Sequence, residues 1–143
     1  MNKKILVICL VVVVVPLAGC DGGTQPWSLT VGGDLTELDG QYKYDAEIEL
    51  GGSPTNVSLT GVRVEYLDAN ESRFGSDFIG NLSGYTLHEF TRNLTEKPAY
   101  ISVKVDSIEN PTGANYQIEG AVVIEEEGEY ILPNRYTDYD PIY

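Results

Sequence analysis

Tyr42-Lys43-Tyr44-Asp45-Ala46-Glu47-Ile48-Glu49-Leu50 is the stretch that decides the fold. Apolar residues alternate here with charged ones, so an extended strand would have one apolar and one charged face. No amphipathic helix of useful length is present. The same period of two recurs elsewhere in the chain, clearly at 62–66, 99–105 and 116–124 and more weakly at 27–31, 73–79, 85–90 and 129–132. The pattern predicts an all-β chain of half-buried strands.

Turn-forming residues separate these strands about every 8 to 12 residues. They lie at Gly32-Gly33-Asp34, Asp39-Gly40, Gly51-Gly52-Ser53-Pro54, Asp68-Ala69-Asn70-Glu71, Gly80-Asn81-Leu82-Ser83-Gly84, Asn110-Pro111-Thr112-Gly113 and Glu126-Glu127-Gly128. Val57 and Leu59 are out of phase with Val62 and Val64, and a β-bulge near Thr60-Gly61 would reconcile them. Seven or eight short strands predict a single Ig-like antiparallel β-sandwich. A small β-barrel is the alternative.

The first nineteen residues have the organisation of a secretory signal peptide. Two lysines precede an apolar run from Ile5 to Val15, which Pro16 ends. The run has about eleven residues, whereas a helix needs roughly twenty to span a bilayer. A cleaved signal peptide is therefore predicted, with an uncleaved membrane anchor as the alternative.

The exit from this run, Leu17-Ala18-Gly19-Cys20, resembles the lipobox of bacterial and archaeal lipoproteins. The resemblance implies that the sulfur of Cys20 receives a lipid and that Cys20 becomes the first residue of the mature protein. The alternative is a chance cysteine beside an ordinary cleavage site. The predicted organisation is a signal peptide at 1–19, the lipidated cysteine and a short tether at 20–26, the sandwich at 27–132 and a Tyr/Asp-rich tail at 133–143.

The charge of the mature chain is strongly negative. From Asp21 onward the chain holds all 22 acidic residues and seven basic ones, a net charge of −15. Such a surface repels nucleic acid and anionic lipid head groups, so nucleic-acid binding is excluded. The composition resembles that of proteins from extremely halophilic archaea, and screening predicts greater stability in concentrated salt. An ordinary acidic exported protein is the alternative.

A second resemblance rests on Val62-Arg63-Val64-Glu65-Tyr66-Leu67-Asp68, followed by Ile101-Ser102-Val103-Lys104-Val105. A strand that ends in Tyr-Leu-Asp and a polar turn is similar to small extracytoplasmic sandwich domains of the FxLYD type. The similarity spans about Tyr44 to Asp106, and the leading Phe of that motif is missing. This family implies a fold and an extracytoplasmic location, without a defined chemistry.

Four Asn-x-Ser/Thr sequons are more than chance predicts for this composition. Their asparagines are Asn56, Asn70, Asn81 and Asn93, and all four lie in predicted turns or near strand ends. N-glycans are attached at such exposed positions. The alternative is that Asn, Ser and Thr gather in turns for conformational reasons.

Other residues give weaker signals. His88, the single histidine, is expected on a strand surface or half-buried, and it lacks the partners of a catalytic or metal site. Cys20 is the only cysteine of the mature chain, so an internal disulfide or cysteine-bound zinc is excluded. The acids Glu125, Glu126, Glu127 and Glu129 are expected to form a solvated hairpin tip, and they show no calcium-loop pattern. The tail tyrosines Tyr136, Tyr139 and Tyr143 are expected to fold back over a sheet edge or to fray, although exposed tyrosines also suit recognition.

These observations favour a lipid-anchored, non-catalytic binding or accessory module on the extracytoplasmic face of the cell membrane. Its expected contacts are the membrane, through the lipid on Cys20, and an envelope protein. No cofactor or metal is expected. A structural or protective surface protein without a specific ligand is the alternative. A hydrolase that uses paired carboxylates is a remote one, because 22 acids would produce suitable pairs by chance. The ligand and the oligomeric state are left open.

Overall fold

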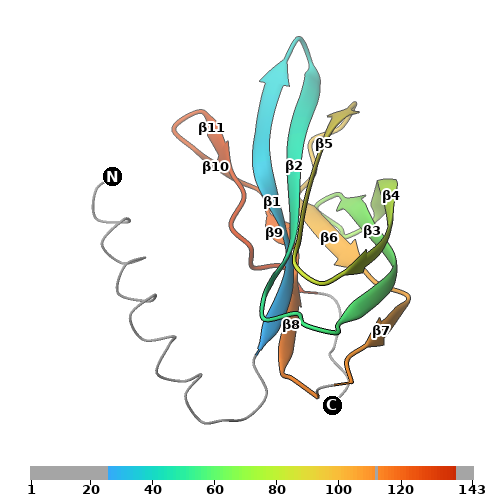
Figure 1. Ribbon diagram of the computed structural model, residues 1–143. Coiled ribbons are helices and arrows are strands. Elements are labelled where there is room, and N and C mark those ends of the chain that lie inside the picture. Colours follow the sequence, from blue (N-terminus) through green and yellow to red (C-terminus); the bar gives the residue numbers. More distant parts are fainter. Residues whose placement is uncertain (1–25, 112, 138–143) are drawn as a thin grey trace.

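A computed structural model describes residues 26–111 and 113–137 (Figure 1). The predicted signal peptide, Cys20, residues 21–25 of the tether and residues 138–143 of the tail lie outside this part of the chain. The described residues contain no helix that is long and apolar enough to cross a membrane. They form eleven strands: β1 Trp27–Leu38, β2 Gln41–Gly52, β3 Ser58–Leu67, β4 Arg73–Ser83, β5 Thr86–Leu94, β6 Tyr100–Lys104, β7 Ser107–Glu109, β8 Tyr116–Glu119, β9 Ala121–Val122, β10 Ile124–Glu126 and β11 Glu129–Ile131.

Two sheets pack against each other. One has the strand order β5-β2-β1-β8, and the other has the order β4-β3-β6-β9, with β7 also paired to β3. All pairs in these sheets are antiparallel except β1 with β8, which is parallel. The predicted all-β sandwich is confirmed. The barrel alternative is wrong, because the sheets do not close on each other within the described residues. The hairpin β10–β11 projects beside the long hairpin β1–β2 (Figure 1).

The core lies between the two sheets and follows the predicted alternation. In β2, Tyr44, Ala46, Ile48 and Leu50 are buried, while Lys43, Glu47 and Glu49 are exposed. The ring of Tyr44 meets that of Tyr66 edge to face at 6.0 Å, and its hydroxyl donates to the carbonyl of Gly32 at 2.6 Å. Burial raises the pKa values of both phenols above the ordinary value of 10. Aromatic side chains therefore join the two sheets at the centre of the sandwich.

The predicted turn at Gly32-Gly33-Asp34 is wrong. These residues lie inside β1, where they pair with Glu47, Ala46 and Asp45 of β2. Gly33 has a φ of 124°, and a Cβ atom there would lie 2.0 Å from the carbonyl oxygen of Asp45. The glycine thus permits a close approach of two paired strands and does not reverse the chain. The predicted Asp39-Gly40 turn does close the hairpin, and both residues have positive φ.

Two further predictions concern β3 and β4. The register of β3 against β4 shifts between Leu59 and Val62, which confirms the bulge at Thr60-Gly61. The predicted loop at Gly80–Gly84 is wrong, because β4 continues to Ser83 and β5 begins at Thr86. Leu82 and Ser83 continue the pairing with Leu59 and Ser58 of β3. Beside them, Asn81 Oδ1 accepts a hydrogen bond from the backbone N–H of Gly61 at 3.2 Å. The bulge thus leaves an N–H that a residue of the neighbouring strand satisfies.

The predicted strand over 116–124 is two strands in two sheets. β8 pairs with β1 and β9 pairs with β6, and Gly120 lies between them. A Cβ atom on Gly120 would lie 2.0 Å from the carbonyl oxygen of Ile101. Because the chain changes sheet here, Ala121 is buried although the alternation predicted it to face outward. Ser102 of β6 is buried as well, although the alternation along 99–105 predicted that it lies on the outer face.

The described part of the C-terminal tail folds back, as expected. Tyr136 exchanges two backbone hydrogen bonds with Gly120. Its ring stacks on Tyr100 with a centroid distance of 4.6 Å. The tail therefore covers the β6–β9 side of the second sheet.

Candidate functional site

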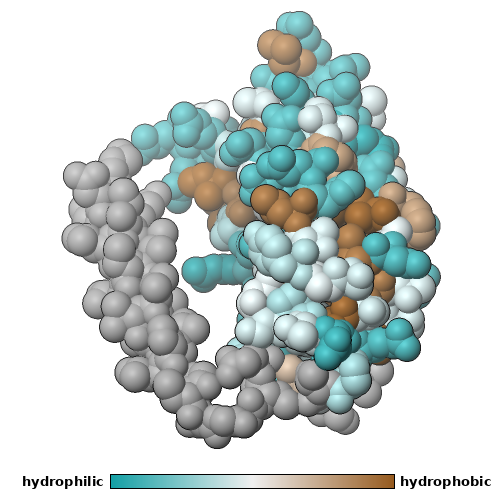
Figure 2. All heavy atoms as spheres, viewed as in Figure 1, coloured by the Kyte–Doolittle hydropathy of each residue, from teal (hydrophilic) through white to brown (hydrophobic). Residues whose placement is uncertain are grey.

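A hollow of about 790 Å³ lies where the hairpins β1–β2 and β10–β11 face each other. Carboxylates line both walls. Its residues are Asp34, Leu35, Thr36, Glu37, Asp39 and Asp45 of the long hairpin and Glu125, Gly128, Glu129 and Tyr130 of the short one. We call it the acidic hollow. Figure 2 shows predominantly hydrophilic residues over the two hairpins in the view of Figure 1.

Asp34 and Asp45 are direct cross-strand partners in the wall formed by β1 and β2. Two like charges at such positions repel each other and destabilise the pair. Asp45 is partly compensated, because it accepts a hydrogen bond from Thr91 Oγ1 at 2.8 Å and its other oxygen lies 3.9 Å from Lys43 Nζ. The fold thus tolerates an unfavourable pair at the edge of the hollow.

Tyr130 joins the two walls. Its hydroxyl donates to Glu37 Oε1 at 3.3 Å, and its ring meets that of Tyr42 edge to face at 6.3 Å. Burial and the negative charges of Glu37 and Glu125 raise the pKa of the Tyr130 phenol. The ammonium group of Lys97 lies 5.7 Å from the centre of the Tyr130 ring. A cation of the chain itself therefore already rests against this wall, in a cation–π contact.

The acids of the hollow are spread along two hairpins. Within 26–111 and 113–137, no group of three or more His, Cys, Asp or Glu side chains could hold a metal ion. Calcium needs six to eight oxygen ligands around one point. The hollow thus presents its carboxylates from two facing hairpins.

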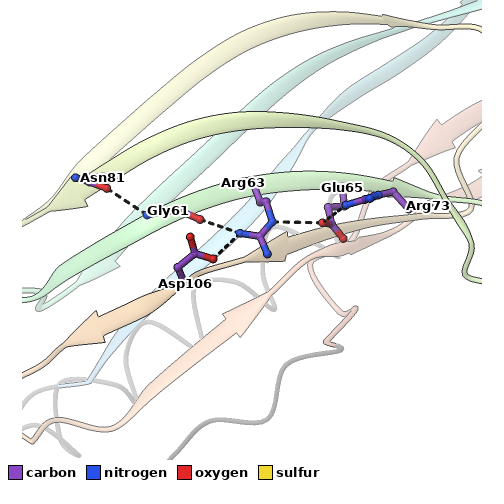
Figure 3. A network of polar contacts seen from close by, with 6 residues as sticks. All are labelled: Gly61, Arg63, Glu65, Arg73, Asn81 and Asp106. Atoms are coloured by element: carbon purple, nitrogen blue, oxygen red, sulfur yellow. Dashed lines mark hydrogen bonds and ion pairs between the residues drawn. The ribbon is translucent and has the colours of Figure 1, made fainter.

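A second polar cluster lies on the outer face of the second sheet (Figure 3). Glu65, which is only 7% exposed, accepts from Arg73 Nη1 at 3.1 Å and from Arg63 Nε at 3.4 Å. Arg63 Nη1 also donates to Asp106 Oδ1 at 2.8 Å and to the carbonyl of Gly61 at 3.3 Å. The cluster pairs its own charges and braces the bulge, which is a structural role.

A third cluster links the edge strands of the two sheets. Asp77 of β4 accepts hydrogen bonds from the Tyr66 hydroxyl at 2.7 Å and from Arg92 of β5. The guanidinium of Arg92 also lies over the Tyr66 ring, 5.5 Å from its centre. These contacts hold β5 against β4 on the open side of the sandwich, and they too are satisfied internally.

The structure places the predicted site residues as follows. The sequon asparagines are all exposed: Asn56 and Asn70 lie in turns, Asn81 lies within β4 and Asn93 lies near the end of β5. His88 is half-buried in β5, 5.9 Å from the ring of Phe90, as predicted. Glu125, Glu126, Glu127 and Glu129 form the exposed β10–β11 hairpin, as predicted.

Sequence reasoning did not identify the acidic hollow. It placed Glu125 and Glu129 in a solvated tip, without a partner surface. The density of acids between Asp34 and Asp45 was the available signal, but the chain alone did not indicate that these residues face a hairpin eighty residues further on. That pairing of hairpins is a property of the tertiary structure.

No protein-family model matches the chain, and comparisons with curated proteins and with solved structures gave no match.

Proposed function

We propose that the chain is a lipid-anchored lipoprotein of the extracytoplasmic membrane face, and that it is a non-catalytic binding or accessory module which holds a cationic segment of an envelope protein in the acidic hollow. The observation that carries the binding role is the hollow itself, with carboxylates on two walls and the Lys97 ammonium against Tyr130. The anchor rests on the lipobox at Leu17-Ala18-Gly19-Cys20.

The size and charge of the hollow favour a peptide segment rich in Lys or Arg. Its volume of about 790 Å³ is in the range of ligand sites. Glu37, Glu125 and Glu129 offer carboxylates to such a segment from opposite sides, and Tyr130 offers an aromatic face. In molar salt the screening length is about 3 Å, so only cations in direct contact with these groups would contribute.

The location of the hollow fits an anchored protein. It lies at the hairpin end of β1, whereas the predicted tether enters β1 at Trp27. Because β1 rises about 3.3 Å per residue, the two ends of this strand are about 35 Å apart. The hollow would therefore face away from the membrane, toward other components of the envelope.

The test is a crosslinking pull-down of the lipidated protein from native membranes at growth salt, with Cys20→Ser as the control for anchoring. The binding variant carries Glu37→Gln and Glu129→Gln, one on each wall of the hollow. A matched control carries Glu49→Gln and Glu119→Gln, which remove the same charge from the first sheet outside the hollow.

We expect the wild type and the matched control each to recover one partner protein, in an amount close to that of the anchored protein itself. Recovery should fall about twofold to thirtyfold with the hollow variant, since two exposed ion pairs are lost and each contributes roughly 0.2–1 kcal/mol. Equal recovery with all three anchored forms would refute the hollow as the binding site. Recovery of no partner would favour a structural surface protein without a specific ligand. Membrane retention of Cys20→Ser would refute the lipid anchor.

A further inference from the structure

The charges of the sandwich are distributed unevenly between its two ends. The segments at the tether end are connected by backbone hydrogen bonds from Trp27 to Asn115, from Ser53 to Pro26 and from Gly84 to Val57. These segments are 26–28, 51–58, 83–86, 109–111 and 113–117, and Glu109 is the only charged residue in them. The side chain of Glu49 lies beside Gly51 at the border of this end. The chain as a whole carries 22 acids. The described part of the tether end is therefore sparsely charged on a strongly acidic protein.

This end also holds a hollow with aromatic walls. Pro26, Trp27, Ser28, Gly52, Asn115, Tyr116 and Gln117 line it, and its volume is about 650 Å³. The rings of Trp27 and Tyr116 stack at a centroid distance of 4.7 Å. The indole Nε1 of Trp27 is buried and has no hydrogen-bond partner among the described residues. Nearby, Tyr85 is 65% exposed in the connection between β4 and β5.

We propose that the sparsely charged tether end of the sandwich lies against the lipid head groups of the membrane that holds the anchor. This inference rests on the proposed lipid anchor. Residues 21–26, which separate Cys20 from the sandwich, reach at most about 20 Å when extended. The hollow begins at Pro26, where this tether ends, so the surface around this hollow must remain closest to the bilayer.

Electrostatics supports the same orientation. Anionic head groups repel a surface rich in carboxylates, and the repulsion is strongest within the screening length. An end with few charges can approach the head groups at a smaller penalty, while the acidic hairpins stay on the far side. Tyr and Trp side chains favour the region between lipid and water, which Tyr85 and Tyr116 would reach from this end. Figure 2 shows paler residues over much of the lower part of the sandwich and more hydrophilic ones on the hairpins above.

The single tryptophan makes the orientation measurable, because Trp27 lines the hollow at this end. The lipidated protein is reconstituted into vesicles of phosphatidylcholine and phosphatidylglycerol that contain a lipid with a spin-labelled head group. Quenching of Trp27 fluorescence by the spin label then reports contact of the tether end with the bilayer. Cys20→Ser protein mixed with the same vesicles gives the unanchored reference.

A matched pair of variants separates docking from general charge effects. Gln117→Glu adds a carboxylate beside the hollow, and Gln41→Glu adds the same group at the far hairpin; both glutamines are exposed in the first sheet. One added charge near an anionic surface changes the ratio of docked to undocked protein about fivefold. We therefore expect reduced quenching with Gln117→Glu, increased quenching with Gln117→Lys, and unchanged quenching with Gln41→Glu.

The outcomes separate this proposal from the anchor. Protein that sediments with vesicles but shows no quenching of Trp27 would overturn the docking and leave the anchor in place. Protein that fails to sediment would overturn both. An equal effect of Gln117→Glu and Gln41→Glu would also overturn the docking, because the response would then depend on net charge and not on position. Quenching that is lost with Gln117→Glu and increased with Gln117→Lys would support it.

Discussion

Replacement of Asp34 by Asn should stabilise the protein at low salt and have almost no effect at molar salt. Asp34 faces Asp45 directly across β1 and β2, where Cβ atoms are about 5 Å apart. For carboxylates about 6 Å apart in water, Coulomb's law gives a repulsion of about 0.7 kcal/mol. The neutral amide of the substituted asparagine would remove this repulsion and keep the size of the side chain.

The salt dependence follows from the screening length, which is about 10 Å at 0.1 M and about 3 Å at 1 M. At a separation of about 6 Å, the repulsion falls to about 0.4 kcal/mol at 0.1 M and to about 0.1 kcal/mol at 1 M. We expect Asp34→Asn to raise the free energy of unfolding by these amounts. The assay is urea unfolding of the soluble Cys20→Ser form at a series of salt concentrations.

Glu49→Gln is the matched control, because Glu49 lies on the same face of the first sheet as Asp34 but pairs with the uncharged Thr30 and Leu87. Its effect reports the general benefit of removing one negative charge. The reasoning is refuted if Asp34→Asn stabilises no more than Glu49→Gln, or if its effect is the same at low and molar salt. A lysine-rich peptide should stabilise the wild type more than Asp34→Asn, since a ligand stabilises the folded state that binds it.

Four further predictions test other features. Gly120→Ala should destabilise the fold by more than about 3 kcal/mol, because its Cβ would lie 2.0 Å from the Ile101 carbonyl oxygen. Gly75→Ala, whose Cβ would meet its nearest side-chain atoms at 3.4 Å, should have a small effect. Chemical unfolding compares the two variants, and equal costs would contradict the close approach of Gly120 to β6. Glu65→Ala should cost about 1–3 kcal/mol in the same assay, because Arg63 and Arg73 would lose their shared acceptor; a neutral effect would contradict the bracing role. The free energy of unfolding should fall as the pH rises above about 10, because the raised pKa values of Tyr44 and Tyr66 keep both phenols neutral in the folded state while the same phenols ionise in the unfolded chain. Unfolding measurements from pH 9 upward test this, and Tyr44→Phe should weaken the decline. Where the native protein carries N-glycans, Asn70 and Asn93 should be occupied in preference to Asn56, which lies in the tether end. Peptide mass spectrometry measures the occupancy of each asparagine, and a glycan on Asn56 of the anchored form would contradict the proposed orientation.

The sequence predicted those features that depend on neighbouring residues. Alternation along 42–50 identified the buried face of β2, and the phase change between Leu59 and Val62 identified the bulge. It failed where a distant strand decides. Gly33 and Gly120 resemble turn or strand glycines locally, but each one gives space to the carbonyl of a paired strand. The acidic hollow was missed for the same reason, because its two walls are distant in the chain.

The two ends of the first sheet differ in their charge, and neither arrangement is the one expected from stability or solubility alone. At the hairpin end, Asp34 and Asp45 repel each other, and the fold gains nothing locally from keeping both charged. At the tether end, the residues around Trp27 and Tyr116 carry almost no charge, although an acidic surface would favour solubility. Residues that disfavour folding or solubility locally are expected where a surface also has a function. Under the two proposals, a cationic ligand would relieve the repulsion at one end, and the low charge at the other end would permit contact with head groups. The low charge around Trp27 and Tyr116 and the carboxylates of the hollow would thus together orient the sandwich on its membrane and present the hollow outward.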